Sequence, residues 1–138
     1  MTRFLLRLRY GTSLGALALA LATSSCIDQE PVANIAVGLR FDAVISNVAA
    51  NATLPSISVS VINAVGGVVS TDARQITILG VQNGSTAITV SGTLQRAAVN
   101  GVATFTGLSI AQAGTAYSLI ASGSGLASAS SNTFTVTP

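Results

Sequence analysis

Apolar residues alternate with serine and threonine along most of the chain after residue 54. The pattern is clearest over 57–62 and recurs over 75–78, 87–90, 103–106, 117–122 and 133–137. A period of two places one set of side chains on each face of a strand, so each run is predicted to be a β-strand buried on one side. No useful window after residue 25 has a period of 3.6, and the sequence therefore predicts an all-β fold.

Glycine-containing turns separate these runs. Asn83-Gly84 and Asn100-Gly101 are typical of hairpin turns because both residue types tolerate positive φ, and Gly66-Gly67 follows the first clear strand. We expect about seven short antiparallel strands in residues 34–138, which together form a single β-sandwich domain.

The first 25 residues have the pattern of a secretory signal peptide. Arg3, Arg7 and Arg9 precede a nine-residue apolar run over 14–22. A membrane crossing needs about 20 apolar residues, so export followed by cleavage is favoured over a retained anchor. The net charge of +2 comes from six arginines and four acids, and three of those arginines lie in the signal. From residue 26 onward the charge is therefore 3 − 4 = −1.

The signal ends at Cys26, the single cysteine, after Ser24 and Ser25. This resembles the lipobox of bacterial lipoproteins, although Thr23 stands where the family usually has Leu. The resemblance implies that Cys26 is lipidated, becomes the N-terminus and anchors the chain in the membrane, with 26–33 as a short tether. Ile27 in place of Asp favours the outer membrane. The alternative is cleavage after Ala22, which gives a plainly secreted or periplasmic protein with a lone thiol.

Three segments resemble bacterial immunoglobulin-like modules of the invasin and intimin type. They are Val102-Ala103-Thr104-Phe105-Thr106-Gly107-Leu108-Ser109-Ile110, Ala113-Gly114-Thr115-Ala116-Tyr117-Ser118-Leu119 and Ser131-Asn132-Thr133-Phe134-Thr135-Val136. The resemblance implies an immunoglobulin-like sandwich with a structural or adhesive role.

Four of these residues are predicted to have structural roles. Tyr117 lies two residues before Leu119, as the tyrosine of a tyrosine corner lies before the second core cysteine of antibody domains. The alternative for Tyr117 is a simple half-buried aromatic. Phe105 and Phe134, like Phe41, are expected in the core.

Composition argues against catalysis. The chain has no His and one Cys, which excludes a Ser-His-Asp triad and a cysteine cluster for metal. Gly11-Thr12-Ser13-Leu14-Gly15 matches a nucleophile motif but lies within the signal. Asp42 and Asp72 could share a calcium ion, but the favoured interpretation is that both are solvated loop residues. Asp72 and Arg74 are then expected to form a weak, exposed ion pair. We expect no catalytic residue, metal or cofactor.

The three arginines after the signal, Arg40, Arg74 and Arg96, are dispersed, so no nucleic-acid surface is predicted. The sequons at Asn51 and Asn83 carry little weight in a bacterial lipoprotein. The sequence favours a non-catalytic, lipid-anchored envelope protein with a structural or adhesive module. The alternative is a binding subunit that pairs through an exposed strand edge, because few charges protect such edges here. In either case, the expected partner is a protein or polysaccharide at the cell surface.

Overall fold

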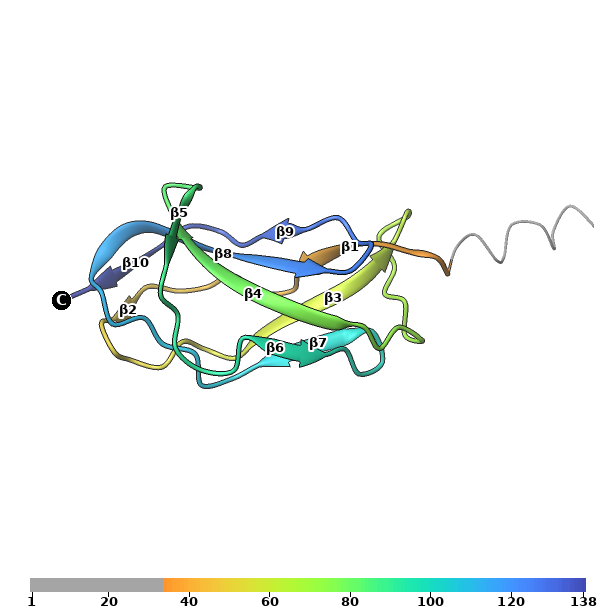
Figure 1. The fold of residues 1–138 in the computed structure, drawn as a ribbon, viewed down its shortest axis with the longest axis horizontal. Helices are drawn as coiled ribbons and strands as arrows, with labels where there is room; N and C mark the ends of the chain where they lie inside the picture. The colour runs from red at the N-terminus through yellow and green to blue at the C-terminus, as the bar shows by residue number, and fades with distance from the viewer. Residues whose placement is uncertain (1–33) are drawn as a thin grey trace, which may run out of the picture. The chain divides into compact units, whose positions relative to one another are not determined.

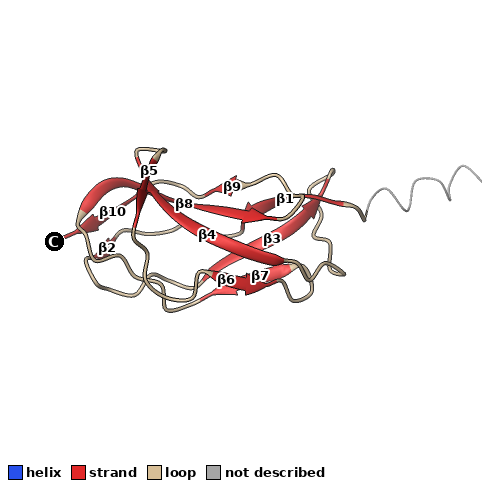
Figure 2. Ribbon diagram, in the orientation of Figure 1, coloured by secondary structure: helices blue, strands red, loops and turns tan. Residues whose placement is uncertain are grey.

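The computed structural model describes residues 34–138, and in this part of the chain every regular element is a strand (Figure 2). The predicted signal peptide, Cys26 and the whole of the predicted tether over 26–33 lie outside the described residues. Residues 34–138 contain no helix with the length and hydropathy needed to cross a membrane.

Ten strands form two sheets (Figure 1). The smaller sheet has the order β1-β3-β7, and the larger has β2-β10-β8-β4-β5, with β6 paired to β4 and β9 paired to β8. The bounds are β1 Ala36–Phe41, β2 Val48–Ala49, β3 Ile57–Asn63, β4 Gln75–Gln82, β5 Thr86–Ile88, β6 Gln95–Ala97, β7 Val102–Phe105, β8 Gly114–Gly123, β9 Ala129–Ser130 and β10 Phe134–Thr137. The prediction of an all-β sandwich is confirmed.

The predicted runs correspond to β3, β4, β5, β7, β8 and β10, but their ends differ. The run over 75–78 is the first half of the eight-residue β4, and Val90 lies beyond the end of β5. The alternation did not predict β1, β2, β6 or β9. Three of these have only two or three residues, too few for a period to be visible.

The prediction of a fully antiparallel sandwich is wrong at one place. β2 runs parallel to β10, with Val48 opposite Val136 and Ala49 opposite Thr137. The reason is that the chain leaves the smaller sheet after β1 and joins the edge of the larger sheet in the direction it was already following. The other strand pairs are antiparallel.

One continuous core lies between the sheets and draws residues from both. Phe105 from the smaller sheet and Tyr117 from the larger are completely buried, and Leu119 and Phe134 are also buried. The prediction that Phe41 belongs to this core is wrong. Its side chain is half-buried and packs against the edge of the core, because β1 ends there and the chain turns away.

Both predicted Asn-Gly turns have the expected backbone. Asn83 and Gly84 have φ of 52° and 75°, and Asn100 and Gly101 have 52° and 78°. The Asn100-Gly101 turn carries the chain from β6 in the larger sheet to β7 in the smaller one. Gly101 is required there because a Cβ would meet the carbonyl oxygen of Val69 at 2.4 Å.

Candidate functional site

A shallow groove runs between the end of β1 and β9, where an edge of the smaller sheet approaches an edge of the larger one. Its volume is about 340 Å³. One wall is formed by residues 39–44 and the other by residues 129–132. Since β1 and β9 belong to different sheets, the groove is a gap in the seam of the sandwich.

Hydrogen bonds close the seam at both ends of the groove. At one end, the amide of Leu39 donates to the carbonyl oxygen of Ala127 (3.1 Å), and the amide of Ala127 donates to that of Val37 (3.0 Å). At the other end, the side chain of Asn132 accepts from the amide of Ile45 (2.8 Å) and donates to its carbonyl oxygen (2.9 Å). Between these points, β1 and β9 are not paired as strands.

Backbone groups from both walls point into the gap. The amide of Asp42 donates to Ser58 on β3, whereas that of Leu39 points the other way, to Ala127. Because hydrogen-bonding direction alternates along a strand, Phe41 presents its N–H and C=O to the groove side. On the opposite wall, the amide of Ser131 donates to Leu119 on β8 (2.8 Å), so Ser130 faces the groove.

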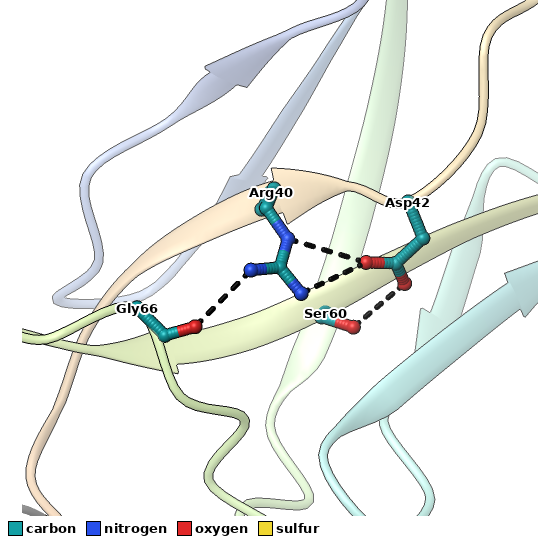
Figure 3. Close-up of polar contacts among 4 residues, drawn as sticks. All are labelled: Arg40, Asp42, Ser60 and Gly66. Atoms are coloured by element: carbon teal, nitrogen blue, oxygen red, sulfur yellow. Dashed lines mark hydrogen bonds and ion pairs between the residues drawn. The ribbon is translucent and has the colours of Figure 1, made fainter.

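An ion pair braces the β1 wall (Figure 3). The Arg40 guanidinium lies 3.3 Å from a carboxylate oxygen of Asp42, measured from Nη2 to Oδ1. The same guanidinium also donates to the carbonyl oxygen of Gly66 (3.1 Å). The hydroxyl of Ser60, which is 2% exposed, donates to the second carboxylate oxygen of Asp42 (2.6 Å). The carboxylate thus satisfies a buried hydroxyl on β3 and keeps the end of β1 against the smaller sheet.

Polar side chains create the break between β9 and β10. The hydroxyl of Ser131 accepts from the amide of Leu119 (2.9 Å), and the side chain of Asn47 accepts from the amide of Thr135 (2.8 Å). These side chains, together with Asn132, replace the backbone partners that a continuous strand would supply. At the break itself, the carbonyl oxygens of Ser131, Asn132 and Thr133 accept hydrogen bonds from neighbouring side chains.

The predicted Asp72–Arg74 pair exists, but it is not the weak exposed pair expected from sequence. Its ion-pair distance is 2.8 Å, and the Asp72 side chain is only 7% exposed. Asp72 also accepts from the backbone amide of Arg74 (2.9 Å), while the guanidinium donates to the carbonyl oxygen of Ser124 (2.9 Å). The pair therefore ties the segment before β4 to the turn after β8.

Asp42 and Asp72 each form an ion pair with a different arginine. Residues 34–138 contain no group of three or more His, Cys, Asp or Glu side chains that could hold a metal ion. Asn51 and Asn83, the two sequon residues, are exposed in turns with φ of 66° and 52°. Cys26 and the nucleophile-like motif at 11–15 lie outside the described residues.

Tyr117 packs against Phe134, another of the predicted structural residues. Its ring lies 6.3 Å from that of Phe134, at an interplanar angle of 59°, and its hydroxyl donates a long hydrogen bond to the carbonyl oxygen of Ala113 (3.4 Å). Tyr117 is completely buried, so the interpretation as a half-buried aromatic is wrong. Leu119 and Phe105 are fully buried in the same core, but no contact places them in the groove.

Sequence reasoning did not find the groove. The β1 wall had a usable signal, since Val37, Leu39 and Phe41 alternate with small or charged residues. The β9 wall had none, because Ala129 and Ser130 form a two-residue strand that only its pairing with β8 defines.

No family model matches the sequence, and no curated protein matches it. Three solved structures have a similar fold. A β-glycosidase from Bacteroides vulgatus has a TM-score of 0.57 and 13% identity over 75% of this chain and 14% of its own. A glycosyl hydrolase family 2 member from Bacteroides cellulosilyticus has a TM-score of 0.53 and 13% identity over 74% of this chain and 14% of its own. A β-glucuronidase from Parabacteroides merdae has a TM-score of 0.50 and 17% identity over 70% of this chain and 12% of its own.

These similarities concern a small β-domain within much larger enzymes. This chain covers at most 14% of the length of each of the three. At 13–17% identity the likeness shows the fold alone, so the structural class is that of β-sandwich domains.

Proposed function

We propose that this protein is a non-catalytic, lipid-anchored component of a bacterial cell envelope, built as one immunoglobulin-like module on a short tether. The observation that carries the proposal is the position of the single cysteine. Cys26 follows a signal-peptide pattern directly and precedes the first strand, which begins at Ala36, by only a few residues. A lipid at Cys26 would also account for a lone thiol in an exported protein.

Two features support the immunoglobulin-like assignment. The strands divide into two sheets, β1-β3-β7 and β2-β10-β8-β4-β5, and the chain crosses between them several times. The first two strands, β1 and β2, lie in different sheets. Tyr117 bonds to the backbone four residues upstream, as the tyrosine of a tyrosine corner does. Leu119 takes the place of the core cysteine, so packing alone connects the sheets at this point.

Mass spectrometry of the mature protein from membranes tests the anchor. We expect an N-terminal peptide that begins at Cys26 and carries acyl chains, with outer-membrane fractionation where the cell has two membranes. Two or more chains are needed for stable anchoring. The matched control is Cys26→Ser, which is expected to release the protein from membranes. An unmodified N-terminus at Thr23 would contradict the proposal.

A second candidate function is a binding subunit that takes a strand from a protein partner. The groove between β1 and β9 favours it, because Phe41 and Ser130 direct backbone groups into a gap between two strand edges. An extended segment that enters the gap would gain main-chain hydrogen bonds on both sides.

Proline scanning distinguishes this candidate from a purely structural module. The N–H of Ser130 faces the groove, so Ser130→Pro removes a donor for the partner without removing a β8–β9 hydrogen bond. We expect Ser130→Pro to lose a protein that co-purifies with the wild type, and Ser130→Ala to retain it. Equal recovery with both variants would eliminate strand addition at this groove.

A further inference from the structure

Exposed large apolar residues are concentrated at one end of the sandwich. Seven such residues are at least 43% exposed in the described chain, and five of them lie where β1 begins and β3 ends. We call these five the tether-side tip: Ile35, Val37, Val65, Val68 and Val99, with exposed fractions of 57%, 43%, 83%, 43% and 70%. The other two, Val44 and Leu79, lie in the groove wall and in β4.

Backbone pairing joins the residues of the tip into one surface. Ala36, between Ile35 and Val37, is opposite Asn63 at the end of β3, and the turn that holds Val65 follows directly. Val68 is bridged to Ile62 and lies against Gly101. Gly101 belongs to the turn whose first flanking residue is Val99. Figure 1 shows these loops together at the end of the body where β1 begins.

Arginine side chains surround the same end. Arg40 reaches the turn at Gly66, Arg74 reaches Ser124, and Arg96 on β6 is opposite Ile76 near the start of β4. Asp42 and Asp72 pair with the first two, and Arg96 forms an ion pair with neither aspartate. Residues 34–138 therefore carry 3 − 2 = +1, and that surplus charge lies on an exposed strand at this end.

The tip is also the part of the body closest along the chain to the expected anchor. Eight residues separate Cys26 from Ile35, and they can extend at most about 30 Å. A tether of this length gives the tip an effective concentration at the bilayer in about the millimolar range, so a weak contact becomes populated.

We propose that the tether-side tip contacts the lipid bilayer, with its valine and isoleucine side chains in the headgroup region, and so holds the sandwich upright on the membrane. This inference rests on the proposed lipid anchor. Apolar side chains supply the contact, and Arg96 adds attraction to anionic lipid. The β1–β9 groove is left free to face a partner.

A chemical anchor tests the contact independently of natural lipidation. Because Cys26 is the single cysteine, the unlipidated mature protein can be coupled through its thiol to a maleimide lipid in vesicles of phosphatidylethanolamine and phosphatidylglycerol. We expect hydrogen exchange to slow several-fold in peptides that cover 35–38, 64–68 and 98–101, relative to protein coupled to a soluble maleimide. A smaller part of this effect should remain on phosphatidylcholine vesicles.

Matched variants test whether the slower exchange depends on the tether-side tip. Val65→Asp and Val99→Asp should abolish the slower exchange, whereas Val44→Asp, at a residue 79% exposed outside the tip, should retain it. Equal exchange in the vesicle-coupled and soluble proteins would overturn the tip contact even if Cys26 is lipidated in the cell. Protection that grows with surface density and survives Val65→Asp would indicate contact between copies instead. An unmodified Cys26 in the native protein would instead overturn the anchor on which this inference rests, whatever the vesicle-coupled protein shows.

Discussion

The Tyr117 side chain packs closely against the backbone of the residues that precede it in β8. Gly114 lies three residues upstream, and a Cβ there would be 2.5 Å from the Tyr117 hydroxyl. Ala116, between them, has φ of 59°, a left-handed conformation that costs a non-glycine residue roughly 1–2 kcal/mol. The strained Ala116 lies in the β8 bulge that places Tyr117 opposite Phe134.

We therefore expect opposite effects from two exchanges of one methyl group. Gly114→Ala should lower the free energy of unfolding by about 1–3 kcal/mol, because the new Cβ overlaps the phenol. Ala116→Gly should leave it unchanged or raise it by up to about 1 kcal/mol, because relief of strain offsets the added backbone entropy. Urea unfolding followed by circular dichroism measures both, and an equal loss in the two variants would contradict this account.

The two ion pairs should differ in their contribution to stability. Arg74→Ala leaves the Asp72 carboxylate, 7% exposed, with only a backbone amide, and should cost about 1–3 kcal/mol. Arg40→Ala removes a pair whose side chains are 49% and 29% exposed, and should cost less than about 1 kcal/mol. Thermal unfolding of the two variants in the same buffer makes the comparison; a larger loss for Arg40→Ala would refute it.

For single residues, the sequence predicted the burial of most large apolar side chains but not of every side chain. Phe105 and Phe134 were expected in the core as large apolar residues, and Tyr117 and Leu119 were singled out by the tyrosine-corner pattern; all four are buried. The prediction was wrong about Phe41 and Asp72, because the turn after β1 and the closeness of Ser124 to Arg74 are tertiary features.

The split between β9 and β10 defines the groove at the level of strands. Asn132 holds Ile45 through two hydrogen bonds and so fixes the link between β1 and β2 at the far end of the gap. The other hydrogen bonds of this link lie near its two ends, at Asp42 and Asn47.

Loss of that side chain should therefore loosen the link locally. In Asn132→Ala, we expect the amide of Ile45 to exchange its hydrogen at least several-fold faster, while the amides of β3 and β4 keep their protection. Hydrogen exchange followed by NMR resolves these positions. Uniform acceleration across both sheets would show a global loss of stability instead.

Alternation predicted the long strands β3, β4 and β8, but it missed the six-residue β1 and the strands of two or three residues, β2, β6 and β9. β2 and β9 are strands because of their partners β10 and β8, not because of their own two residues. A groove made by such strands depends on pairings between distant segments, which no local pattern of one sequence records.

The body has one continuous core shared by both sheets, so residues 34–138 should unfold as one cooperative unit. The chain has no Trp and two Tyr, of which Tyr10 lies within the predicted signal peptide. Tyr117 would then be the only strong intrinsic fluorophore of the mature protein. Its fluorescence and the far-ultraviolet circular dichroism should give the same urea midpoint. Separate midpoints would mean that one sheet unfolds before the other.

The parallel pairing of β2 with β10 determines how the domain responds to a pulling force. β2 is reached from the tether end of the body, and β10 leads to Pro138 at the opposite end (Figure 1). Tension between an anchored N-terminus and a load on the C-terminal side would slide these strands in opposite directions and strain their hydrogen bonds together, including that from Ala50 to Thr137 (2.7 Å). We expect single-molecule stretching from the two ends to meet higher resistance than stretching across a hairpin such as β4–β5, which opens one bond at a time.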